Sequence, residues 1–134
     1  MRNNFFTFLL IMAFSTAYSW SQSDTTNLKT YTLTGKIIEP VELTPHCGTI
    51  AWGTVIELEI EDYSDPAYTR KTIAVIVTCP EFKGEGFFQL GSRYEFQVST
   101  RNPASFGWSI PNKDKLKKYP FAAELWVIDV KTLQ

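Results

Sequence analysis

The sequence predicts an all-β domain of five strands. Several stretches alternate apolar and polar residues with a period of two, the pattern of a strand that buries one face. The only two cysteines, Cys47 and Cys79, bracket two long stretches of this kind. The segments that separate the strand-like stretches contain prolines and glycines, which are typical of turns and loops. At 134 residues with 44% hydrophobic residues, the chain can bury one core.

Residues 1–21 are expected to be a secretory signal peptide. Arg2 gives a positive start, Phe5–Phe14 is almost wholly apolar, and small residues follow. Cleavage would leave a mature chain that begins at Trp20 or Gln22. The apolar run is too short to span a membrane, and no cysteine at the cleavage site offers a lipid anchor. We therefore expect a secreted or periplasmic protein with no stable membrane insertion after signal removal.

The mature chain is predicted to hold a flexible leader, residues 22–28, and one domain, residues 29–134. In the first strand of this domain, threonines and a lysine that face outward alternate with residues that face inward. That face holds Tyr31, Leu33, Gly35 and Ile37. Proline cannot donate to a strand ladder, so Pro40 ends the strand.

The next two strands are predicted to form a hairpin around a turn at Asp62–Pro66. Ile50–Glu61 alternates strongly, and Gly53 within it indicates a bulge or bend. Lys71–Thr78 is a nearly continuous apolar run, which indicates burial on both faces. The predicted pairs are Ile60 with Ile73, Leu58 with Val75 and Ile56 with Val77, with Glu57, Glu59 and Glu61 outside in solvent.

The last two strands are predicted at Arg93–Thr100 and Phe121–Leu133. Before them, Glu85–Leu90 is expected to form one short helical turn that carries two phenylalanines inward. Between them, residues 102–120 are the least regular part of the chain. Three strands, a connector and two strands are the order of an OB-fold, whereas an immunoglobulin-type sandwich needs about seven strands. The predicted fold is therefore a five-stranded OB-like β-barrel with a short helical connector between strands 3 and 4.

Three short stretches carry a resemblance to known proteins: His46–Ile50, Cys79–Glu81, and Gly91 with Tyr94. Together with the signal segment, they resemble small secreted OB-fold-like proteins of unassigned function from Bacteroidota-type bacteria. A Cys-Pro followed by a glycine and a tyrosine also resembles the OB-folds of netrin modules and metalloproteinase inhibitors. The inhibitory function of those proteins depends on an N-terminal cysteine, which the predicted mature chain lacks. The resemblance therefore implies the fold and no activity.

The cysteines are predicted to form a Cys47–Cys79 disulfide, since an oxidising compartment and an even count favour one. The alternative is a metal site made by two thiolates and His46. Two facts argue against this metal site. His46 and Cys47 are adjacent, so their side chains point in different directions on an extended chain, and the sequence has no second histidine. We expect no metal and no other cofactor.

Catalytic residues are not expected. Glu57, Glu59 and Glu61 could bind calcium with Asp62 and Asp65, but the spacing of a calcium loop is missing. Paired catalytic carboxylates need an apolar pocket, which a solvated strand face does not offer. No Gly-x-Ser-x-Gly turn and no phosphate-binding glycine loop is present. The chain is therefore predicted not to be an enzyme.

A candidate binding surface combines basic and aromatic residues in the irregular segment, a combination typical of ligand platforms. Its members are Phe106, Trp108, Lys113, Lys115, Lys117, Lys118 and Tyr119. The alternative is a solvated loop whose aromatics cap one end of the barrel. The formal charge of the whole chain is −1, and loss of Arg2 makes it more negative, so nucleic acid is not an expected partner.

The functional prediction is a non-enzymatic binding module that holds a protein, peptide or glycan through loops at one end of the barrel. It rests on analogy between folds. The alternative is an envelope structural or accessory protein without a small-molecule ligand. A large exposed aromatic patch would favour the binding module. A cleft that holds His46 and a carboxylate with a shifted pKa would favour an enzyme.

Overall fold

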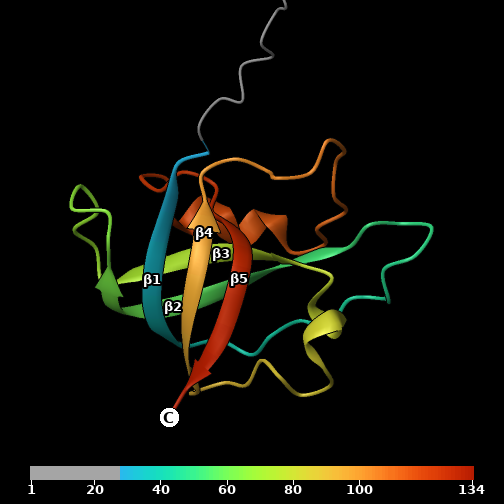
Figure 1. Ribbon diagram of the computed structural model, residues 1–134, viewed down its shortest axis with the longest axis horizontal. Coiled ribbons are helices and arrows are strands. Elements are labelled where there is room, and N and C mark those ends of the chain that lie inside the picture. The colour runs from blue at the N-terminus through green and yellow to red at the C-terminus, as the bar shows by residue number, and fades with distance from the viewer. Residues whose placement is uncertain (1–27) are drawn as a thin grey trace, which may run out of the picture.

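The computed structural model describes residues 28–134 and shows an all-β fold with almost no helix (Figure 1). The predicted signal peptide, residues 1–21, lies outside the described residues, as does the leader up to residue 27. The elements are β1 (Thr30–Ile37), β2 (Gly53–Tyr63), β3 (Thr72–Thr78), η1 (Pro80–Lys83), β4 (Arg93–Ser99), η2 (Lys113–Lys118) and β5 (Trp126–Leu133). No helix in residues 28–134 has the length and apolar character needed to cross a bilayer.

The five predicted strands all form, and each pairs with two neighbours. The sheet therefore closes into a barrel in the order β1-β2-β3-β5-β4. All neighbouring strands are antiparallel except β3 and β5, which run parallel and share the single pair Ile76 and Trp126. In Figure 1, β1, β4 and β5 pass in front of β2 and β3 and cross them.

Apolar side chains that alternate along the strands fill the interior. On β1, the predicted inward residues Leu33 and Ile37 are fully buried. The neighbouring strand β4 contributes the largest fully buried side chains, Tyr94 and Phe96. The same interior holds Ile56, Leu58, Ile73, Val75, Val77 and Val98. Full burial of one such side chain stabilises the fold by about 1.5–3 kcal/mol.

The predicted register of the β2–β3 hairpin is wrong by two residues. The observed pairs are Leu58 with Ile73, Ile56 with Val75 and Thr54 with Val77. The last pair is Glu59 with Thr72, so the connection spans residues 60–71 and is longer than the predicted turn at Asp62–Pro66. Within it, the Asp65 carboxylate accepts a hydrogen bond from the Ala67 amide at 3.0 Å. Because a shift of two residues preserves side-chain parity, the interior residues still point inward.

The strand boundaries and the bulge differ from the prediction. Residue 53, not 50, begins β2, and residue 126, not 121, begins β5. Gly53 therefore starts a strand and does not interrupt one. A bulge instead lies at Glu61, the residue of β2 that is skipped where Thr34 pairs with Asp62 and Gly35 with Ile60. A Cβ on Gly35 would stand 2.7 Å from the backbone oxygen of Glu59, so the close approach of the two strands requires glycine there.

The connector between β3 and β4 contains one 3₁₀ turn, η1, which comes earlier than the predicted turn at Glu85–Leu90. Pro80 stands at the first position of this turn, where the fixed φ of proline is favourable. Gly84 and Gly86 adopt positive φ and prevent a helix further along. Phe87 and Phe88 do pack against the core as predicted. A second 3₁₀ segment, η2, lies in the stretch for which no helix was predicted.

The irregular segment, residues 102–120, covers the outer face of β2 and β3. Ala74 and Ile76 on β3 join Val55 and Trp126 in a second apolar cluster. The segment packs Trp108, Ile110, Leu116 and Tyr119 against this cluster. The buried Asn112 side chain anchors it, accepting from the Val55 amide at 2.9 Å and donating to the Val55 carbonyl at 3.1 Å. This cover confirms that β3 is buried on both faces.

Candidate functional site

The seven residues of the candidate binding surface have different environments. Trp108 and Tyr119 are half-buried and pack on the second apolar cluster. Phe106 remains 53% exposed, with its ring 4.9 Å from that of Trp108. Lys113, Lys115 and Lys118 form ion pairs with glutamates, and Lys117 is exposed. The segment therefore contributes aromatic side chains to the fold while exposing Phe106 and several lysines.

Glu57 departs from its predicted place in solvent. The side chain does lie on the outer face of β2, but it is only 3% exposed because the 102–120 segment covers it. Tyr119 and Lys118 donate hydrogen bonds to its carboxylate at 2.9 and 3.1 Å. Glu59 and Glu61 are exposed as predicted, and Glu61 pairs with Arg93 at 2.6 Å. The Arg93 guanidinium lowers the pKa of Glu61 below its ordinary value.

The predicted disulfide between Cys47 and Cys79 is present, with the two Cα atoms 5.6 Å apart. It joins the loop before β2 to the first residue before η1. Cys79 has a φ of +43°, a left-handed conformation that few residues other than glycine adopt. The Cys47 amide also donates a hydrogen bond to the Glu81 carboxylate. Two covalently joined segments, residues 41–47 and 79–88, are thus held side by side.

A pocket of about 430 Å³ opens between residues 41–46 and residues 80–88, and we call it the disulfide pocket. Apolar walls come from Val41, Phe87 and Phe88, which also pack against the barrel core. Polar groups come from Thr44, His46, Glu42, Glu81 and Glu85. A volume of this size, with apolar walls and a few polar groups, is typical of ligand sites.

Two polar atoms of the disulfide pocket residues are buried without a hydrogen-bond partner in the described part of the chain. These are Oγ1 of Thr44 and Oε2 of Glu81. Glu81 uses its other oxygen, Oε1, to accept from the Cys47 amide. Buried polar groups without partners are uncommon in folded proteins because each one loses its hydration. These two oxygens therefore offer unused acceptor capacity where the pocket forms.

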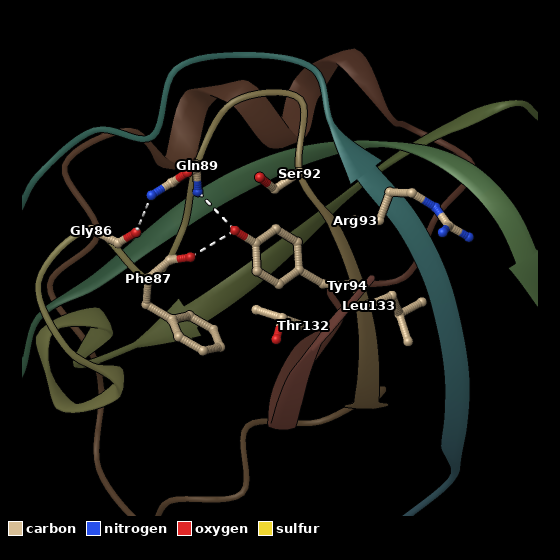
Figure 2. Close-up of a pocket in the computed structure, with 8 residues that line it drawn as sticks. All are labelled: Gly86, Phe87, Gln89, Ser92, Arg93, Tyr94, Thr132 and Leu133. Atoms are coloured by element: carbon tan, nitrogen blue, oxygen red, sulfur yellow. Dashed lines mark hydrogen bonds between the residues drawn. The ribbon is translucent and has the colours of Figure 1, made fainter.

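Tyr94 holds the connector that forms one wall of the pocket. Its hydroxyl donates to the Phe87 carbonyl at 2.7 Å and accepts from the Gln89 amide at 2.8 Å (Figure 2). The ring of Tyr94 stands 5.7 Å from those of Phe87 and Phe88. A fully buried barrel residue thus fixes a segment that has almost no regular structure of its own.

Figure 2 shows a second hollow, of about 310 Å³, which shares Gly86 and Phe87 with the disulfide pocket. Arg93 is the charged residue that lines it, and its guanidinium is already bound to Glu61. Its remaining lining includes Tyr94 and Leu133. Neither of the two buried side-chain oxygens without a partner in residues 28–134, those of Thr44 and Glu81, belongs to a residue that lines this hollow.

The disulfide pocket is also lined by the only histidine of the sequence, His46, together with three glutamates. His46 is exposed in the loop beside the disulfide. Cys47, Cys79 and Glu81 bring candidate metal-ligand atoms within 4.8 Å of one another. The two sulfurs are bonded to each other, however, and a disulfide lacks the thiolates that bind metals.

Sequence reasoning missed most of the pocket, because its residues lie in loops without periodicity. Leu43 and Phe82 could have indicated a binding surface here, since both are large apolar residues close to the cysteines in largely polar loops. They are 95% and 75% exposed. No family model, no curated protein and no solved structure matches the chain.

Proposed function

We propose that the chain is a non-enzymatic, secreted or periplasmic binding module with an OB-like barrel, and that it holds a protein or peptide in the disulfide pocket. The strand order β1-β2-β3-β5-β4, with a connector after β3, supports the OB-like assignment. The disulfide supports an oxidising compartment. The resemblance to small secreted proteins of Bacteroidota-type bacteria points the same way.

The observation that carries the proposed function is the position of exposed apolar side chains around the pocket. Leu43 lines it and is 95% exposed. Phe82, 75% exposed, projects from η1 between two lining residues, Pro80 and Gly84. Exposed apolar residues beside a concave site are typical of interaction surfaces. A protein or peptide that covered both side chains would remove their apolar area from water.

Affinity capture with matched variants tests this function. The bait is the mature, oxidised chain, residues 22–134, in an envelope extract of the native host. We expect the double variant Leu43→Ser/Phe82→Ser to lose a partner that the parent protein retains. The control is Phe106→Ser/Phe121→Ser, which removes exposed apolar area from the 102–121 region. Loss of the partner with the control alone would move the binding surface to Phe106 and its neighbours.

The proposed location has its own test. Mass spectrometry of the native protein is expected to show an N-terminus at Trp20 or Gln22 and the protein outside the cytoplasm. An N-terminus at Met1 would contradict secretion. The cleaved chain should also carry the Cys47–Cys79 bond, visible as a mass gain of two hydrogen atoms on reduction.

A further inference from the structure

We propose that the disulfide pocket receives a cationic side chain, a lysine ammonium or an arginine guanidinium, of its protein partner. This inference rests on the proposed function and names the chemistry that the pocket recognises. It follows from the charges that line the pocket, from the buried oxygen of Glu81, and from the shape and composition of the walls.

The charges on the lining residues are negative. Glu42, Glu81 and Glu85 all line the pocket, and no lysine or arginine does. Lys115 pairs with the Glu42 carboxylate at 3.0 Å and so compensates one of these charges. The nearest basic residue along η1, Lys83, pairs with Asp129 at 3.3 Å. Glu81 and Glu85 form no ion pair within residues 28–134.

Glu81 is the more informative of these two carboxylates. Its Oε1 is occupied by the Cys47 amide, while its Oε2 is buried without a partner among the described residues. A carboxylate oxygen that has lost its hydration is stabilised most by a charged donor, because charge-assisted hydrogen bonds are about twice as strong as neutral ones. The Thr44 hydroxyl oxygen, also buried without a partner among the described residues, can accept a hydrogen bond as well.

The walls suit the stem of a long basic side chain. Lysine and arginine bury their methylene groups along apolar surface while the charged end reaches polar groups. Val41, Phe87 and Phe88 supply that apolar surface. Phe87 and Phe88 also offer aromatic rings, which attract cations placed over their faces. A ligand with only apolar groups would leave the carboxylates unpaired, and an anionic ligand would meet like charges.

The test compares three peptides that differ at one position. Acetylated, amidated Gly-Leu-X-Leu-Gly carries lysine, its neutral analogue norleucine, or glutamate at X. Each is titrated into the oxidised mature chain and followed by amide NMR shifts. We expect the lysine peptide to shift residues 41–46 and 80–88, and to bind about tenfold more tightly than the norleucine peptide. The glutamate peptide should bind most weakly.

Variants assign the effect to the pocket. Glu81→Gln keeps an oxygen for the Cys47 amide and removes the charge, so it should weaken the lysine peptide about tenfold without changing the norleucine peptide. Glu124→Gln, at a glutamate that pairs with Lys113 outside the pocket, should change neither. If Glu81→Gln proves unfolded by its amide spectrum, Glu85→Gln takes its place, with the same expected selectivity.

Three results would overturn the inference. Equal affinity for the lysine and norleucine peptides would mean that the pocket does not select a cation. Shifts confined to η2 would place the contact elsewhere, and no shifts with any peptide would leave the pocket without a basic ligand. None of these results decides the proposed function, which depends on the Leu43/Phe82 capture experiment.

Discussion

The Glu57 carboxylate, buried on the outer face of β2, accepts a hydrogen bond of 2.9 Å from the Tyr119 hydroxyl. Lys118 donates to the same oxygen at 3.1 Å. These partners lie 62 and 61 residues away along the chain. A buried carboxylate is tolerated only when it is paired and hydrogen-bonded. This network therefore fastens the end of η2 to the barrel wall and lets an acidic residue lie beneath the 102–120 segment.

The first prediction compares two glutamates on β2. Glu57→Ala removes the acceptor for Tyr119 and Lys118 and should destabilise the fold by about 1–3 kcal/mol. Glu59→Ala is the control, because that side chain is 56% exposed and only pairs with Lys36 at 3.8 Å. Its effect should stay within about 0.5 kcal/mol. Urea denaturation measures both. Equal effects of the two substitutions would contradict the structural role of Glu57.

The second prediction concerns alkaline pH. Burial, and next the hydrogen bond to Glu57, raise the pKa of Tyr119 well above its ordinary value. A raised folded-state pKa means that the folded protein favours the neutral phenol. The stabilisation is thus fully present below about pH 10, the ordinary pKa of tyrosine, and is lost as the pH rises through the folded-state value.

The control for this pH effect is Tyr119→Phe, which cannot ionise at that position. Between about pH 9 and pH 11, the parent protein should lose more stability to urea than the variant. Tyr63 also has a raised pKa because of its burial, and it contributes equally to both proteins. Parallel losses in the two proteins would show that Tyr119 does not carry the effect.

The alternation along β1, β2 and β4 was enough to predict which side chains fill the barrel. Leu58 points inward in the predicted and in the observed register, because parity survives a shift of two residues. The register itself was missed, because the connection between the paired parts of β2 and β3 spans residues 60–71 and is not a tight turn at Asp62–Pro66. Local patterning thus determined the face of each side chain but not its partner.

Features made by distant segments could not be predicted in this way. Nothing near Glu57 in the sequence shows that Tyr119 will cover it. The disulfide was predictable from the even cysteine count and the expected oxidising compartment. The pocket beside it was not, since Thr44 and Glu81 line one pocket only after the disulfide and η1 have brought two loops together.

The third prediction concerns the close approach of β1 and β2. A Cβ at Gly35 would lie 2.7 Å from the Glu59 backbone oxygen, and backbone atoms cannot move aside without disturbing the ladder. Gly35→Ala should therefore destabilise the fold by about 1–3 kcal/mol. Gly107→Ala is the control, because a Cβ there meets no atom within 4 Å. Thermal unfolding should separate the two variants, and a neutral Gly35→Ala would refute the bulge geometry.

The last prediction concerns the disulfide and the backbone that it joins. Its cysteines are 32 residues apart, and closing a loop of that size should stabilise the fold by about 3–4 kcal/mol in the chain-entropy model. Guanidinium denaturation of Cys47→Ala/Cys79→Ala measures this loss. A reductant should lower the parent protein to a similar stability and leave the double variant unchanged.

Cys79 adds a second, separable effect, because its φ of +43° costs a residue with a Cβ about 1–2 kcal/mol. Glycine avoids this cost in the folded state but gains freedom in the unfolded chain, which offsets part of the benefit. Cys47→Ala/Cys79→Gly should therefore be more stable than Cys47→Ala/Cys79→Ala by about 0.5–1 kcal/mol. Should the alanine variant be the more stable one, residue 79 would not keep its left-handed conformation once the disulfide is gone, and the Cys79–Glu81 side of the pocket would depend on the bond for its shape.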